Sequence, residues 1–144
     1  MFLGQHQITF EAGDRLAVPA RFRDLLAQGA YITQGFDRNL LVLTADAFQA
    51  IYARFTAMNI ADPLARLLLR MILGSATELE IDPSGHMLIP PKLREFAGLE
   101  ADAILVGQGK YIEVWTPAQW QQQVLRLQDA ESNAERFAGL VLTA

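Results

Sequence analysis

The sequence predicts a mixed α+β fold, mostly β-strands with short helices, in which two similar units form one pseudo-twofold β-barrel. Three observations predict it: an internal repeat, strand-like alternation of apolar residues in each copy, and a short helical pattern after each strand-ending proline. The stretch 8-ITFEAGDRLAVPARFRDLLAQG-29 resembles 79-LEIDPSGHMLIPPKLREFAGL-99 along its length. The chain therefore contains one structural unit twice.

The repeat has a defined register. Aligning Pro19 with Pro90 pairs residues that are 71 positions apart. Later in each unit the spacing becomes 72, where Leu40-Val42-Thr44 aligns with Ile112-Val114-Thr116. An ordered series with one insertion indicates a duplication. The matched pairs include Phe10 with Ile81, Glu11 with Asp82, Arg15 with His86, Arg21 with Lys92 and Arg23 with Arg94.

Each unit is expected to open with two strands joined by a tight turn. Apolar residues alternate around 8–10 and around 79–81, and a Gly/Asp or Pro-Ser-Gly turn follows each stretch. The second strands, 16–18 and 87–89, end where proline removes a backbone donor. A short helix follows in both copies.

Two further strands and a second helix complete each unit. Gly29 and Gly98 are predicted to terminate the short helices. Thr44 and Thr116 are predicted N-caps of the second helices. The expected strands are 30–35 with 39–44 in the first unit, and 103–108 with 110–115 in the second.

The chain is expected to divide into four segments. Asp62 as N-cap, Pro63 in the first turn and Gly74 at the end predict a helix between the units. A strand-rich unit of about 45 residues is close to the size below which a single core fails, so the units should pack together. The predicted segments are a first unit 1–60, a linking helix 61–75, a second unit 76–124 and a C-terminal helical tail 125–144.

Composition excludes several classes of protein. The 144 residues are 51% hydrophobic and 19% charged, which excludes general disorder, and the absence of cysteine excludes disulfides and thiolate chemistry. Residues 1–10 lack the pattern of a signal peptide. The apolar run 67–73 is too short to span a bilayer and contains Arg70. We expect a soluble, cytoplasmic protein without a membrane partner.

The net charge of −4 argues against an indiscriminate nucleic-acid binder. Residues 1–71 contain 7 basic and 6 acidic side chains, whereas residues 72–144 contain 5 and 10. Any DNA-facing positive charge must therefore be local and lie on the repeated motif.

The repeated turn is the candidate site. A β-ribbon can enter the major groove of DNA, arginine can donate two hydrogen bonds to guanine, and neighbouring cations can contact phosphates. The competing interpretation is that these cations pair with acids on the surface. Gly13 and Gly85 are predicted to adopt positive φ in the turns. The candidate DNA-binding residues are Arg15, Arg21 and Arg23 in the first copy, and His86, Lys92 and Arg94 in the second.

The sequence resembles the MraZ family, bacterial proteins built from two SpoVT-AbrB-type units. The resemblance implies a transcriptional regulator of the division and cell-wall gene cluster, often a repressor of its own promoter. It also implies ring-shaped homo-oligomers that bind short, direct, G-rich promoter repeats in double-stranded DNA and associate with the nucleoid. The resemblance rests on 15-RLAVPARFR-23, 33-TQGFDRNLLV-42, 74-GSATELEID-82, 88-LIPPKLREFAGLE-100 and 112-IEVW-115.

The turns depart from the pattern of that family. Its first motif is an acidic residue, any residue, Lys, Gly and Arg, whereas the first turn here is 11-EAGDR-15. The second motif usually ends in Gly-Arg, and His86 stands in place of that arginine. Removing one cation that neutralises a phosphate lowers the salt slope of DNA binding by about 0.9. The sequence therefore predicts weakened or altered DNA binding.

His86 gives a pH hypothesis. A histidine is cationic only near or below its ordinary pKa of about 6.5, so DNA affinity is expected to rise as the pH falls from 8 to 6. The alternative is that His86 is a neutral turn residue without a role in binding.

Other classes of function fit the sequence less well. An enzyme is not expected, because the two histidines are 80 positions apart and no nucleophile, metal cluster or cofactor loop is present. Glu78, Glu80 and Asp82 alternate on one predicted strand face, with no basic or metal-ligating group expected to join them. We therefore expect no catalytic residue, metal, cofactor or small-molecule substrate.

The main rival is an oligomeric protein-interaction scaffold with lost or altered DNA binding. An antitoxin is disfavoured because those proteins usually carry one unit and a disordered tail. The tail here ends in apolar residues expected to contact a neighbouring subunit. These residues are Phe137, Leu140, Val141 and Leu142, and the aromatic residues expected in the core are Tyr31, Phe36, Trp115 and Trp120.

Overall fold

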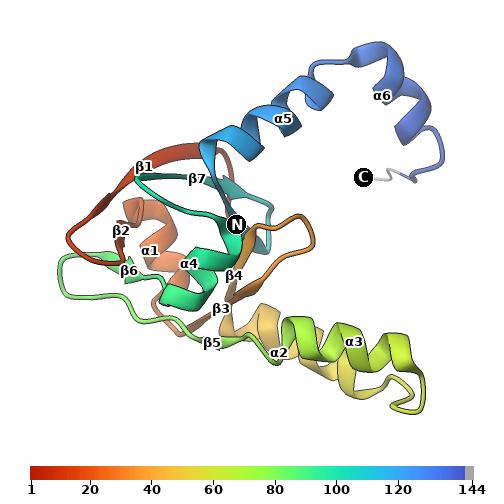
Figure 1. Cartoon of the computed structure of the whole chain (residues 1–144), viewed down its shortest axis with the longest axis horizontal. Helices are drawn as coiled ribbons and strands as arrows, with labels where there is room; N and C mark the ends of the chain where they lie inside the picture. Colours follow the sequence, from red (N-terminus) through yellow and green to blue (C-terminus); the bar gives the residue numbers. More distant parts are fainter. Residues whose placement is uncertain (142–144) are drawn as a thin grey trace.

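Eight antiparallel strands form one curled sheet in the computed structural model, which describes residues 1–141 (Figure 1). The strand order is β5-β3-β4-β8-β7-β1-β2-β6, and helices join the strands, so the predicted α+β class is confirmed. The strands are β1 (Gln5–Glu11), β2 (Arg15–Ala17), β3 (Ala30–Gln34), β4 (Leu40–Thr44), β5 (Thr77–Glu78), β6 (His86–Leu88), β7 (Asp102–Gly107) and β8 (Tyr111–Trp115). The helices are α1 (Ala20–Leu26), α2 (Ala45–Thr56), α3 (Pro63–Ile72), α4 (Pro91–Ala97), α5 (Pro117–Leu127) and α6 (Ala130–Phe137).

Two strand pairs join the repeated units at equivalent positions. Leu16 of β2 lies opposite Met87 of β6, and these residues are 71 positions apart. Leu41 of β4 lies opposite Glu113 of β8, and these are 72 positions apart. Both pairings therefore bring repeat-equivalent residues face to face, as a pseudo-twofold axis through them requires. The register confirms the repeat.

The sheet is a half-barrel whose two edges are connected by the segment 77–82. β5 pairs with β3 at one edge, and Ile81 forms a bridge with Met87 of β6 at the other. The first unit has one continuous strand, β1, where the second has this divided segment. The prediction of an equivalent strand around 79–81 was therefore only partly right, because the segment must bend to reach both edges.

The core between the two units is apolar and draws on both copies. Leu16 and Met87 are fully buried at the centre, and Phe22 of α1 and its repeat equivalent Leu93 of α4 are buried beside the sheet. Phe2 packs edge-on against Phe22, with ring centroids 5.2 Å apart. Burial of this shared apolar surface, at roughly 25 cal/mol per Å², stabilises the two units as one body.

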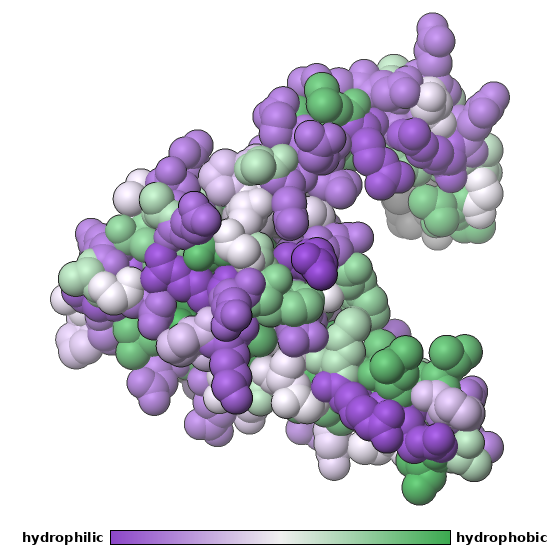
Figure 2. Space-filling view, in the orientation of Figure 1, coloured by the Kyte–Doolittle hydropathy of each residue, from purple (hydrophilic) through white to green (hydrophobic). Residues whose placement is uncertain are grey.

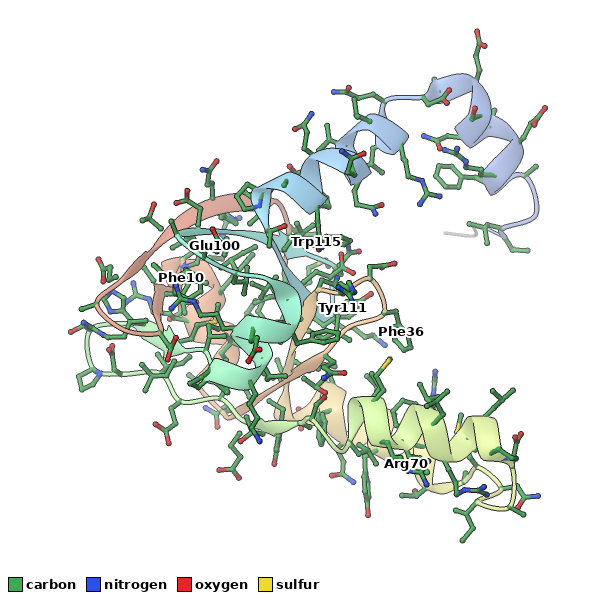
Figure 3. All side chains as sticks on the ribbon, viewed as in Figure 1. Phe10, Phe36, Arg70, Glu100, Tyr111 and Trp115 are labelled. Atoms are coloured by element: carbon green, nitrogen blue, oxygen red, sulfur yellow. The ribbon has the colours of Figure 1, made fainter. Side chains whose placement is uncertain are left out.

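The aromatic predictions hold for three of the four residues. Tyr31 stacks on Phe48 at 4.3 Å, and Trp115 packs against Trp120 at 5.7 Å. Phe36 was expected in the core, but 66% of its surface is exposed. It lies in the loop between β3 and β4, and Figure 3 shows it beside the strands at the end of the molecule that carries α2 and α5.

The predicted helix caps are present. The Oγ1 atoms of Thr44 and Thr116 each accept a backbone N–H at 3.1 Å, and Asp62 accepts one at 2.9 Å. Gly98 ends α4 in the left-handed region, at φ 69°. Gly29 also has positive φ, but α1 ends earlier, with Ala27 as its C-cap.

Two helical arms extend from one end of the half-barrel, one formed by α2 and α3 and the other by α5 and α6 (Figure 1). Both arms expose apolar side chains, which appear green in Figure 2. No helix among residues 1–141 is both long and apolar enough to cross a membrane. Leu142 of the predicted apolar tail lies outside the described residues. The exposed apolar residues of the arms are Tyr52, Met58, Ile60, Leu64, Leu67, Leu125, Leu127, Phe137, Leu140 and Val141.

Candidate nucleic-acid interface

Both repeated turns lie at the end of the molecule opposite the arms (Figure 1). We call residues 12–14 turn 1 and residues 83–85 turn 2. Turn 1 joins β1 to β2, and turn 2 precedes β6. β2 and β6 pair in antiparallel fashion, so the turns that precede them lie at the two ends of this three-residue ladder.

Each turn is bonded to the strand exit of the other unit. The backbone N–H of Val18 donates to the carbonyl of Gly85 at 3.0 Å. The N–H of Ile89 donates to the carbonyl of Asp14 at 2.9 Å. Val18 and Ile89 are repeat equivalents, as are Asp14 and Gly85. The pseudo-twofold symmetry of the core therefore extends to the turns.

Four ionisable side chains, which we call the charge quartet, lie beside these turns: Glu11, Arg15, Asp82 and His86. Arg15 Nε donates to Asp82 Oδ2 at 2.9 Å, and Arg15 Nη2 lies 3.1 Å from His86 Nδ1. The other ring nitrogen of His86, Nε2, is paired with Glu11. Glu11 and Asp82 are repeat equivalents, as are Arg15 and His86. Each basic residue thus pairs with the acidic residue of the other unit.

The two basic members of the quartet differ in exposure. The side chain of Arg15 is 35% exposed, whereas that of His86 is 12% exposed. Arg15 can therefore reach a ligand on the surface. His86 lies mainly beneath it, in contact with Arg15, Glu11 and Asp82.

Asp82 remains ionised over a wide pH range. Its Oδ1 accepts the backbone N–H of His86 at 2.9 Å, and this hydrogen bond is the largest cause that lowers its pKa to about 2. The hydrogen bond from Arg15 lowers the pKa further, against an opposing effect of desolvation. Asp82 is therefore an anion at neutral pH and forms an ion pair with Arg15.

Arg94 of α4 is bound to turn 1. Its Nη1 atom donates to Asp14 Oδ1 at 2.8 Å and to the carbonyl of Gly13 at 3.1 Å. Its Nε and Nη2 atoms donate to the carbonyls of Leu99 and Glu100. Asp14, the anion that departs from the family pattern, is therefore neutralised within the protein.

The remaining candidate cations lie on the short helices. Arg21 and Lys92 are exposed in the first turns of α1 and α4, and within residues 1–141 neither forms a side-chain hydrogen bond or ion pair. Arg23 lies against Gly85 of turn 2. Gly13 and Gly85 have φ of 75° and 84°, which confirms the predicted positive-φ turn positions.

Sequence reasoning missed the acidic half of this site. Asp82 was expected to have no basic neighbour, but it contacts both Arg15 and His86. The signal was available, because Glu11 and Asp82 align in the repeat just as Arg15 and His86 do. In the described part of the chain no group of three potential ligands could hold a metal ion.

An open depression of about 460 Å³ lies on one side of turn 1. Asp14 and Arg15 line it together with the exposed acids Glu78 and Glu80. These carboxylates repel phosphate, so the depression is an unfavourable place for a nucleic-acid backbone.

The fold and the paired turns define a class of duplicated α+β half-barrel proteins in which two equivalent turns share one surface. The family described as "MraZ protein, putative antitoxin-like" matches the chain twice, over residues 1–71 and 72–142. The chain belongs to the MraZ family. The two matches meet within α3, whereas the four-segment division expected from the sequence remains a prediction.

Relatives of nearly the same length support this assignment. The chain is 39% identical to a protein of Thermomicrobium roseum over 98% of this chain and 100% of the relative. It is 40% identical to a protein of Roseiflexus castenholzii, over 96% and 94% of the two chains. A protein of Shewanella amazonensis is 40% identical over 90% and 88%. Each of the three is named "Transcriptional regulator MraZ".

Proposed function

We propose that this protein is a sequence-specific DNA-binding transcriptional regulator, acting as a repressor of the division and cell-wall gene cluster. It reads short direct repeats in promoter DNA through its paired turns, as a ring-shaped homo-oligomer associated with the nucleoid in the cytoplasm. It is not an enzyme. The names of its relatives support the regulatory role.

The observation that carries this proposal is the position of Arg15. It lies beside its repeat equivalent, His86, on the strand pair that separates the two turns, and about a third of its side chain is exposed. A guanidinium in this position can donate two hydrogen bonds to a guanine edge. A pair of turns in place of a recognition helix is compatible with the major groove, which admits a β-ribbon.

Exposed cations flank this position. We assign direct DNA contacts to Arg15, Arg21 and Lys92. His86, Arg23 and Arg94 belong to the same site, but each also lies against another part of the protein. Positive charge is thus local, as an acidic chain that binds DNA requires.

The apolar surfaces of the two helical arms support assembly. Leu64 is 73% exposed, Leu67 is 61% exposed and Leu140 is 71% exposed. Several large apolar side chains exposed on one helical arm are typical of an interaction surface. Because the arms extend away from the turns (Figure 1), copies that join through them leave the turns open to DNA. Several linked turns would then bind repeated sites with a raised effective concentration.

Fluorescence anisotropy with DNA from upstream of the protein's own operon tests the proposal. Specific binding should weaken steeply between low and moderate salt, because phosphate contacts release counterions. Arg15→Ala should lose about 1–3 kcal/mol of binding free energy and its base specificity. Arg54→Ala, which removes an exposed arginine of α2, is the matched control and should bind normally. Absence of binding at low salt would refute the regulator.

The alternative is an oligomeric protein-interaction scaffold with lost or altered DNA binding. The charge quartet favours it, since both basic residues at the turns already face carboxylates. A scaffold would assemble through its arms but would not bind the upstream DNA even at low salt. Light scattering and the anisotropy assay together separate the two functions.

A further inference from the structure

Arg94 and its repeat equivalent, Arg23, each reach the turn of the opposite unit. Arg94 extends from α4 of the second unit to Gly13 and Asp14 of turn 1. Arg23 extends from α1 of the first unit to Gly85 of turn 2. Each helix therefore contacts the turn of the other unit through one arginine, in keeping with the pseudo-twofold symmetry.

The guanidinium of Arg94 is largely occupied by the protein. Its three nitrogen atoms donate four hydrogen bonds, to three carbonyl groups and to the carboxylate of Asp14. Its Cζ atom also lies 3.8 Å from the centre of the Phe10 ring. A guanidinium carries five N–H groups, so almost none of its donor capacity is left for a phosphate.

Arg23 makes the equivalent contact by packing. Gly85 has no side chain, and the guanidinium of Arg23 fills that space: a Cβ atom at Gly85 would lie 3.0 Å from Cδ of Arg23 and closer still to its Nη1. The residue equivalent to Gly85 in turn 1 is Asp14, which reaches Arg94 with its carboxylate. One turn is therefore held by an ion pair and the other by van der Waals contact.

We propose that Arg94 is a positioning residue for turn 1, with Arg23 its counterpart at turn 2. The inference rests on the proposed function. The two turns are held at a fixed separation before DNA binds, and the ion pair between Arg94 and Asp14 fixes turn 1. Asp14, the acidic residue that departs from the family pattern, then stabilises the conformation of turn 1 through its ion pair with Arg94.

Hydrogen exchange without DNA tests the anchoring directly. In Arg94→Lys, which keeps the charge but removes the planar fork, exchange of the Ile89 amide should rise several-fold, because its acceptor is the carbonyl of Asp14. The Val18 amide, bonded to Gly85, should stay protected. Arg23→Ala should show the reverse pattern. Equal exchange of Ile89 in the wild type and in Arg94→Lys would overturn the inference.

DNA binding then separates positioning from direct contact. Arg94→Lys and Asp14→Asn should each bind DNA about tenfold more weakly, with an unchanged salt slope, and the double variant should bind little more weakly than Arg94→Lys alone. If Arg94 contacts a phosphate instead, Arg94→Lys should bind DNA normally and Arg94→Ala should lower the salt slope by about 0.9. That result would overturn the inference.

Two further variants serve as safeguards. Asp14→Asn keeps the size of the side chain, so it remains informative if Arg94→Lys folds poorly, and Arg54→Lys controls for the exchange of one cation for another. If the wild type does not bind DNA, the proposed function fails, while the exchange result still decides the role of Arg94.

Discussion

The Nη2 atom of Arg15 lies 3.1 Å from Nδ1 of His86, and the two residues occupy the same position in the two units. A guanidinium can only donate, so this contact needs a neutral imidazole whose Nδ1 accepts. The proton then lies on Nε2, which faces Glu11. A proton on Nδ1 would remove this acceptor and place two cations side by side.

DNA affinity is expected to rise as the pH falls from 8 to 6. Histidine ordinarily titrates near pH 6.5, and the groups that face His86 are Glu11, Arg15 and Asp82. Protonation adds one positive charge beside the turns and releases Arg15 from Nδ1. Anisotropy titrations at constant ionic strength should show a several-fold gain in the wild type and none in His86→Gln. A flat wild-type profile would exclude His86 from this role.

Asp82 should make folding sensitive to strong acid. Its pKa is lowered to about 2, mainly by the backbone N–H of His86, from an ordinary value of 3.8. A carboxyl group with a depressed pKa stabilises the fold above its unfolded-state value, and this contribution disappears as pH falls toward its folded-state value. Urea unfolding of the wild type and Asp82→Asn should therefore converge between about pH 4 and pH 2. If the difference between them is the same at every pH, the lowered pKa of Asp82 does not contribute to stability.

Gly85→Ala should destabilise the protein more than Gly109→Ala. Both glycines have similar positive φ, 84° and 80°, at which a side chain costs about 1–2 kcal/mol. A Cβ at Gly109 meets nothing within 4 Å, whereas one at Gly85 meets Arg23. Chemical denaturation should show the added cost at Gly85. In an Arg23→Ala background, the added cost of Gly85→Ala should fall to that of Gly109→Ala. Equal costs of the two single variants in the wild-type background would show that the Arg23 side chain moves aside without cost.

Charged substitutions on the first arm should reduce assembly. Leu64→Glu or Leu67→Glu places a carboxylate on an exposed apolar surface of α3, and burying it against another copy would be strongly unfavourable. Light scattering should report a lower mass than for the wild type. Gln49→Glu, which adds the same charge at an exposed polar position of α2, is the control. An unchanged mass in both leucine variants would exclude this surface from the assembly.

Much of the architecture could be predicted because a repeat fixes relationships between residues that are distant in sequence. The spacings of 71 and 72 reappear in the structure as the facing pairs Leu16 with Met87 and Leu41 with Glu113. Helix ends were also predictable, since an N-cap such as Thr116 acts on a backbone N–H three residues away. Phe36 was placed wrongly because apolar character does not distinguish a strand from the loop beside it.

The sequence by itself determined that two copies of one unit fold together, and that Arg15 and His86 occupy equivalent positions. Only the tertiary structure decided that Arg15 pairs with Asp82, His86 with Glu11, and Arg94 with Asp14. Local patterns assign a side chain to a face of a strand or helix. The partner of a charge depends on which strands become neighbours, and here the pairing of β2 with β6 brings each turn against residues about 70 to 80 positions away.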